Sequence, residues 1–340
     1  MKINSEVFRD MFALPSGNDD SNPEGASKER PISIPGVTSG EFRSLMTMIY
    51  CSPSDKLFLD MQARNKSRSG SFQNFTFYSD VARLANRFCM TDIENWATNQ
   101  LRSLMCTSAS CISNGARDQT KDGIPIIFTL TLQYARVIAD TVLEHNVQNL
   151  NQRYCITPGS LSAPVLLGLL HGPQLRQQNP SMFGFLFVAL LNLGHSVWMK
   201  EPFTREDRVA FFSAQSFLTP LPESLGKDLA APLLARPRLT KDGYLEVFEN
   251  KDCSGECHRR LSRAWNVIFG STYYKDVASR KALKATARLE RLPYRRLEFA
   301  SIIRTYSACN GDCSSKALGC LDEGIHQLFV RLGGYYQSID

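Results

Sequence analysis

The sequence predicts an α+β chain with few short strands and many helices, followed by a mainly α-helical C-terminal region. Apolar residues recur at spacings of three and four along most of the 340 residues, as they do in amphipathic helices. Only Pro31–Ile34 shows the apolar–polar alternation of a short strand. A polar break at 107–122 separates the early elements from the rest. We therefore expect a first domain at 1–105, a linker at 106–122 and a helical region at 123–340.

The composition is that of a folded intracellular protein. Apolar residues make up 43% of the chain and aromatic residues 10%, which is enough to fill real cores. A secretory signal would need a basic start followed by an apolar run, whereas charged residues interrupt the first twelve positions. The ten cysteines are therefore expected to be reduced thiols. We expect a location in the cytoplasm or the nucleus.

Local patterns predict the first elements. A helix is predicted from Asn4 or Ser5 until Pro15 ends it, and a polar loop without periodicity follows at 16–30. After the short strand, Thr38 begins a second helix, and Glu41 three residues later completes a capping box. The buried face of this helix is predicted to consist of Phe42, Leu45, Met46, Ile49 and Tyr50.

An insertion and a helical pair complete the first domain. Residues 52–74 are rich in serine and basic residues and are predicted to form an inserted loop. Helical spacing returns at 81–88 and again at 93–101, which predicts an αα-hairpin. Further helices are predicted at 126–148, 163–170, 183–198, 205–217, 258–269, 279–292, 297–306 and 321–332.

The most membrane-like stretch is 182–199. It has about the minimum length of a membrane-spanning helix, roughly 18 residues, but it contains Asn192, His195 and two glycines. We therefore expect a buried core helix here, with His195 as a core histidine, and no membrane association.

Three blocks of the first hundred residues resemble the BTB/POZ family. Residues 5–12 resemble its signature of a small polar residue, a bulky apolar pair and then Met-Phe. Residues 31–50 are similar to the strand and helix that follow in that family, and 81–101 resemble its closing helical pair. The blocks occur in the family's order within 4–104. The insertion after Tyr50 resembles that of the fungal branch, whose members carry helical C-terminal regions.

The resemblance implies a non-catalytic protein-interaction module, acting as an adaptor or a transcription-related scaffold with other proteins as partners. It also implies an apolar interaction surface. For most residues of that surface, packing in the chain's own core is the alternative interpretation. The surface would consist of Val7, Phe8, Met11, Phe12, Phe42, Leu45, Ile49 and Tyr50.

The sequence also departs from the family pattern. A complete domain has further strands before Ser5, so either the gene model is truncated or the domain is a degenerate copy. The family's homodimer contacts include those strands, and a homodimer of this chain is expected to be weakened. Cullin scaffolds bind an apolar-x-Glu feature where this chain has Ser39-Gly40-Glu41. Because a serine replaces the apolar residue, the sequence does not support cullin recruitment.

Two cysteine pairs near the C-terminus have a spacing that zinc sites use. Cys253 and Cys257 enclose Ser-Gly-Glu, and Cys309 and Cys313 enclose Asn-Gly-Asp. Zinc takes tetrahedral thiolate ligands, and paired ligands on a turn are their usual sequence mark. The alternatives are free thiols near helix ends or a redox role. We expect no cofactor, with zinc at these four cysteines as the alternative.

Basic residues are concentrated between Arg236 and Arg304, where sixteen Lys+Arg face eight Asp+Glu. Part of this region is a stripe at helical spacing that could contact nucleic-acid phosphates. Such stripes are usually solvated helix faces, and no nucleic-acid motif accompanies this one, so we expect no nucleic-acid contact. The stripe consists of Lys281, Lys284, Arg288, Arg291 and Arg295.

No catalytic motif is present in the sequence. The five histidines are scattered, and there is no zinc-protease histidine pair, nucleophile elbow, phosphate-binding glycine loop or dinucleotide fingerprint. We therefore predict that the chain is not an enzyme. The alternative to a protein-interaction module is a metal-stabilised, nucleic-acid-associated regulator that uses the cysteine pairs and the basic stripe.

Overall fold

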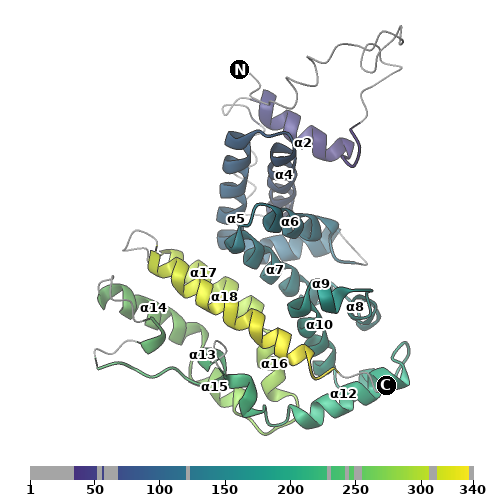
Figure 1. Cartoon of the computed structure of the whole chain (residues 1–340), viewed down its shortest axis with the longest axis vertical. Coiled ribbons are helices and arrows are strands. Elements are labelled where there is room, and N and C mark those ends of the chain that lie inside the picture. The colour runs from purple at the N-terminus through teal and green to yellow at the C-terminus, as the bar shows by residue number, and fades with distance from the viewer. Residues whose placement is uncertain are drawn as a thin grey trace. The chain divides into compact units, whose positions relative to one another are not determined.

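The computed structural model describes residues 34–51, 56, 68–119, 123–227, 231–241, 245–248, 255–305 and 312–336. The chain divides into two compact units, Met1–Gly115 (unit 1) and Ala116–Asp340 (unit 2). The regular structure of the described ranges consists of sixteen α-helices, two short 3-10 helices and one isolated bridge between Leu239 and Leu245 (Figure 1). The predicted mainly helical character is therefore confirmed. The predicted strand lies outside these ranges except for Ile34, which is not in a strand.

Unit 1 contains α2 (Ser39–Tyr50), α4 (Arg68–Arg87) and most of α5 (Thr91–Gln119). The predicted cap of α2 is confirmed. The Thr38 hydroxyl accepts from the Glu41 backbone N–H at 3.3 Å, and the Glu41 carboxylate accepts from the Thr38 N–H at 2.7 Å. This reciprocal pair satisfies two backbone donors at the start of α2.

The predicted insertion at 52–74 is wrong at its C-terminal end, because α4 already begins at Arg68. Phe72, Phe75 and Tyr78 are buried, so the helical apolar spacing extends upstream of the predicted start. The serines and glycine of this stretch indicated a loop, but three buried aromatic residues outweigh their low helix propensity.

The predicted linker at 106–122 is also wrong over its helical part. Residues 106–119 belong to α5, in which only Ser108 departs from helical geometry, with φ −133° and ψ 20°. The division between the two units, after Gly115, falls within this helix and also within the range 106–122 that was predicted to separate two domains. The predicted helical pair is present: α4 and α5 are joined at Phe88–Met90, and the Tyr78 and Trp96 rings meet edge to face at 5.5 Å.

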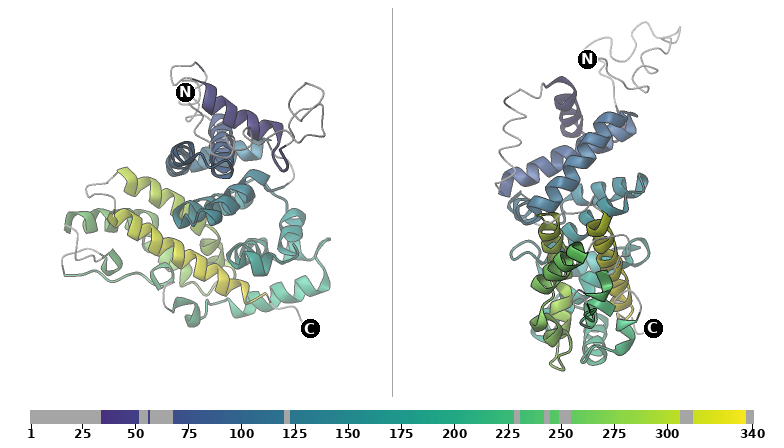
Figure 2. Two further views of the ribbon diagram at one scale, coloured as in Figure 1. Left: turned by 45° about the horizontal axis from the view of Figure 1, so that its top comes forward. Right: turned by 90° about the vertical axis from the view of Figure 1, so that its left-hand side faces the viewer.

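Unit 2 is built from helices only, apart from the isolated bridge, as far as its described residues show. Two further views show the same helices (Figure 2). The helices are α6 (Ile126–Val137), α7 (Thr141–Ile156), α8 (Ala163–Leu170), α9 (Leu175–Gln178), α10 (Pro180–Asn192), α11 (His195–Trp198), α12 (Arg205–Phe217), η1 (Glu223–Gly226), α13 (Ala231–Leu234), η3 (Glu246–Phe248), α14 (Gly255–Ile268), α15 (Ser271–Val277), α16 (Lys284–Glu290), α17 (Leu292–Thr305) and α18 (Asp312–Gly333).

The centre of unit 2 is α10, which packs along α18, the long yellow helix of Figure 1. Every side chain of α10 from Ser181 to Leu191 is buried, which confirms the predicted core helix over this part. The expectation that His195 is a core histidine is wrong, because His195 lies beyond the break at Gly194 and is exposed. The two helices approach closely at Gly184, where a Cβ atom would overlap the carbonyl oxygen of Phe329 and lie 2.7 Å from its carbon. Glycine therefore allows the contact that organises this core.

Two predicted helices are each divided in two. The segment 126–148 breaks at Ala139, whose φ is 52°, and Asp140 then caps α7 by accepting from the Leu143 N–H at 3.0 Å. The segment 183–198 breaks at Gly194, whose φ is 80°. Apolar periodicity continued across both breaks, which is why the sequence indicated single helices. The helix expected at 279–292 begins only at Lys284, and α9, α13 and α15 were not predicted.

Candidate interaction surface

The candidate surface of unit 1 is carried by α2, which packs on α4. Leu45 and Ile49 are buried, so they hold α2 in place and do not form an exposed face. Phe42 is half-buried. Tyr50 was predicted on the buried face but is 72% exposed at the C-terminal end of the helix. The other predicted members, Val7, Phe8, Met11 and Phe12, lie outside the described residues.

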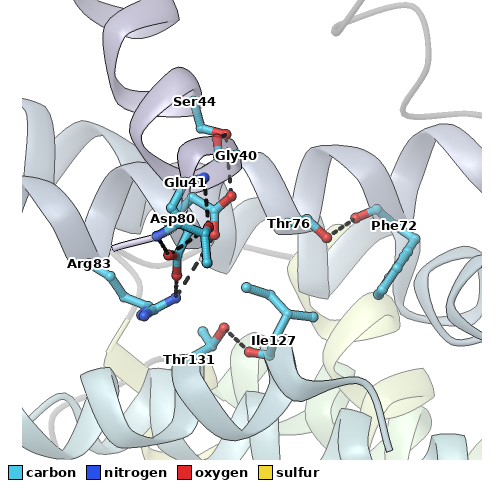
Figure 3. A network of polar contacts seen from close by, with 10 residues as sticks. Gly40, Glu41, Ser44, Phe72, Thr76, Asp80, Arg83, Ile127 and Thr131 are labelled. Atoms are coloured by element: carbon cyan, nitrogen blue, oxygen red, sulfur yellow. Dashed lines mark hydrogen bonds and ion pairs between the residues drawn. The ribbon is translucent and has the colours of Figure 1, made fainter. Parts of the chain in front are cut away.

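A polar network attaches the start of α2 to α4 (Figure 3). Arg83 of α4 donates to the Glu41 carboxylate at 3.0 Å and lies 3.9 Å from Asp80. Ser44 donates its hydroxyl to Asp80 at 3.2 Å. Glu41 therefore caps α2 through Thr38 and also pairs with α4. The orientation of α2 is fixed by apolar packing and by these charges together.

The two carboxylates of this network differ in electrostatics. Burial raises the pKa of Asp80 to about 6, and the nearby Glu41 charge adds to the increase, while Ser44 and Arg83 oppose it. Burial also acts to raise the pKa of Glu41, but hydrogen bonds from Thr38 and Arg83 outweigh it and lower that pKa. The Arg83 guanidinium therefore lies near both carboxylates, and it is closer to Glu41 than to Asp80.

The predicted zinc ligands are only half described. Cys257 and Cys313 are buried in the core of unit 2, whereas Cys253 and Cys309 lie outside the described residues. Within the described part of the chain, no group of three or more His, Cys, Asp or Glu side chains is placed to hold a metal ion. The eight cysteines described there form no disulfide. The four-cysteine hypothesis therefore stays untested.

The members of the basic stripe before Pro293 were predicted to share one face of a helix, but they do not all belong to one helix. Lys281 precedes α16, Arg291 follows it, and Arg295 belongs to α17. Lys284 and Arg288 both pair with Asp276, at 2.7 and 2.5 Å. Two of the five cations are therefore already held by a carboxylate of α15, a partner that sequence spacing could not reveal.

Sequence reasoning missed a buried ion pair that joins three helices of unit 2. Arg296 of α17 donates two hydrogen bonds to Asp322 of α18, both at 2.6 Å, and a third to the Asn146 side chain of α7 at 2.5 Å. Asn149 donates to the same Asp322 at 3.3 Å. The signal was available, because α7 places buried Asn and Gln side chains among its apolar positions. Such residues need internal partners.

A second missed cluster joins α8, α12 and the end of α18. Asp207 accepts hydrogen bonds from the Tyr336 hydroxyl and the His171 Nε2, both at 2.8 Å. Its other oxygen accepts from the backbone and hydroxyl of Thr204, the N-cap residue of α12. Burial and the Asp207 charge raise the pKa of Tyr336, so its phenol stays protonated as a donor. The Tyr336 ring lies against Phe183, Phe187 and Phe211.

Comparison with family models, with curated proteins and with solved structures gives no match for this chain. Among the helices that the structure describes, none combines the length and the apolar character needed to cross a bilayer.

Proposed function

We propose that the chain is a non-catalytic protein-interaction molecule, whose unit 1 is of BTB/POZ type and whose helical unit 2 supplies partner specificity. The three resemblance blocks of the sequence support the family assignment. The observation that carries the proposal is the environment of Tyr50. This large aromatic side chain is 72% exposed, while Ile49 beside it is 5% exposed. Exposed aromatic residues on a rigid helix are typical anchors of protein interfaces.

Contacts at both ends of α2 support the view that this helix is rigidly held. Glu41, Ser44, Asp80 and Arg83 join its first turns to α4. Leu45 and Ile49 anchor the rest of the helix by burial. A helix that is already held in place loses little conformational entropy when a partner binds its exposed end.

The proposal that the chain is not an enzyme rests on the polar clusters as well as on the absence of catalytic motifs from the sequence. The His171–Asp207–Tyr336 cluster resembles a catalytic triad only in its residue types. One Asp207 oxygen caps α12, and Tyr336 is held as a protonated donor within an aromatic cluster. A nucleophile needs the opposite, a lowered pKa or an adjacent base that removes its proton. These groups therefore act as structural links between helices.

The first partner to test is a second copy of the chain, because members of the resembled family self-associate. Sedimentation velocity of the full chain over about a hundredfold range of concentration is expected to show a weak, concentration-dependent dimer. Tyr50→Ser should weaken that association by about tenfold, or roughly 1.4 kcal/mol, by removing the exposed aromatic ring.

The matched control is Val267→Ser on α14 of unit 2. Val267 is also 72% exposed, so the control removes a similarly exposed apolar side chain elsewhere on the chain. It should leave the association unchanged. A chain that remains monomeric at every concentration, or one whose association responds equally to both substitutions, would contradict the proposed surface.

A further inference from the structure

Unit 2 contains a concentration of positive charge that the proposed interaction surface does not use. Its members are Lys284 and Arg288 of α16, Arg291 in the turn after α16, and Arg295 of α17; these four residues are termed the basic cluster. Lys284 and Arg291 are exposed, and Arg288 and Arg295 are half-buried. Burial lowers the pKa of Arg295, and the nearby charges of Arg288 and Arg291 lower it further.

Asp276 neutralises only part of the basic cluster. This carboxylate accepts Arg288 Nε at 2.7 Å and Arg288 Nη2 at 2.5 Å, and it pairs with Lys284 Nζ at 2.7 Å. These cations and their hydrogen bonds lower the pKa of Asp276, so it is ionised at neutral pH. One negative charge therefore holds two positive groups in fixed positions, and both keep donors that Asp276 does not use.

The charge and the hydrogen-bond donors of Arg295 are only partly balanced by neighbouring groups. One of its terminal N–H groups donates to the Ile268 carbonyl at the end of α14, and its guanidinium lies 5.0 Å from the centre of the Tyr273 ring. The Nε atom is buried and has no hydrogen-bond acceptor among the described residues. Burial is the main cause of its lowered pKa. A half-buried cation with an unsatisfied donor and like-charged neighbours favours a nearby anion.

The other acidic side chains nearby supply little balancing charge. Glu290 faces α10, where it accepts from the Asn192 side chain at 2.8 Å, and burial raises its pKa to about 7. It is therefore about half protonated at neutral pH. Glu298 acts on Arg295 but also interacts with Tyr294. The four cations of the basic cluster therefore outnumber the carboxylates near them, which are Asp276, Glu298 and the partly protonated Glu290.

We propose that the basic cluster binds a phosphate group, either free on a small molecule or on a lipid headgroup. The excess of positive charge suits a phosphate monoester, which carries about −1.5 to −2 at neutral pH. Three of the four members are arginines, whose planar fork suits phosphate oxygens. The ion pair with the buried Asp276 fixes the half-buried Arg288 side chain before the ligand arrives. This site is independent of the Tyr50 surface.

The test is a titration of the full chain with inorganic phosphate at constant ionic strength, followed by NMR of the arginine Nε–H groups. Saturable shifts of a small set of arginine signals are expected. Arg291→Glu should weaken binding by about tenfold, because it replaces an attractive charge with a repulsive one. Arg291 is exposed and has no hydrogen bond from its side chain among the described contacts, so the variant should fold normally.

Lys200→Glu is the control, because it reverses an exposed charge elsewhere in unit 2. It should change phosphate affinity by less than about twofold. Shifts that do not saturate, or that respond equally to Lys200→Glu and Arg291→Glu, would overturn the proposal.

Two further binding experiments distinguish a lipid headgroup from a free phosphate compound. Co-sedimentation with phosphatidylcholine vesicles that contain phosphatidic acid, lost in Arg291→Glu, would identify a lipid headgroup. Phosphate binding without vesicle binding would identify a free phosphate compound. Duplex DNA that binds through Arg291 and is not displaced by inorganic phosphate would contradict a small-ligand site.

Discussion

Asp80 is a buried carboxylate whose ionisation opposes folding of unit 1. Its pKa is raised from 3.8 to about 6, chiefly by burial. The folded state therefore binds this proton more tightly than the unfolded state does. The contribution of Asp80 to stability is greatest below pH 4 and is lost as the pH rises through about 6. Glu41 acts in the opposite direction, because its pKa is lowered and its contribution is lost as the pH falls.

Asp80→Asn is expected to stabilise unit 1 at alkaline pH relative to the unsubstituted chain. The asparagine keeps an oxygen that can accept from Ser44 but cannot ionise. Because one pKa unit corresponds to about 1.4 kcal/mol, the advantage should grow by about 1 kcal/mol between pH 5 and pH 8. Urea denaturation at the two pH values measures it. Asp92→Asn on exposed α5 surface is the control, and an equal pH dependence in both variants would refute the assignment.

At the scale of single elements, the approach of α10 to α18 depends on a glycine. Gly184→Ala would place a methyl group against the Phe329 backbone, which cannot move as a flexible side chain can. We expect a loss of about 2–3 kcal/mol in the free energy of unfolding of unit 2. Chemical denaturation followed by circular dichroism measures this loss.

The control for this prediction is Gly319→Ala within α18 itself. A Cβ atom at Gly319 meets nothing within 4 Å, so the substitution should stabilise the helix by up to about 1 kcal/mol. The same glycine-to-alanine substitution is therefore expected to lower the free energy of unfolding at Gly184 and to raise it at Gly319. A neutral Gly184→Ala would show that the two helices are farther apart than described.

The elements also show how far the sequence could predict this structure. The capping box placed the start of α2, and strong periodicity placed α8 and α12 with the correct ends. The breaks at Ala139 and Gly194 were missed, because a residue with positive φ leaves the apolar pattern unchanged. At the candidate surface, periodicity correctly placed Leu45 and Ile49 on the buried face of α2 but wrongly placed the exposed Tyr50 there as well. The partners of Asp80 and Asp276 depend on tertiary packing, which local spacing does not contain.

At the scale of the whole molecule, two compact units predict two unfolding events. Trp96 belongs to unit 1, whereas Trp198 and Trp265 are buried in unit 2. The fluorescence of the unsubstituted chain should show both transitions in urea, and Trp96→Phe should remove the signal of unit 1 alone. Gly184→Ala should shift only the transition of unit 2. A single transition in the unsubstituted chain that shifts as a whole in Gly184→Ala would indicate one cooperative unit.

The central claim is that the exposed end of α2 contacts another protein, in the first instance a second copy of this chain. Photo-crosslinking tests it most directly, with the photoreactive residue p-benzoylphenylalanine placed either at Tyr50 or at the equally exposed Val267. The account predicts a chain–chain adduct from Tyr50 that excess unlabelled chain suppresses, and no such adduct from Val267. Absence of an adduct from Tyr50, or equal adducts from both positions, would contradict it.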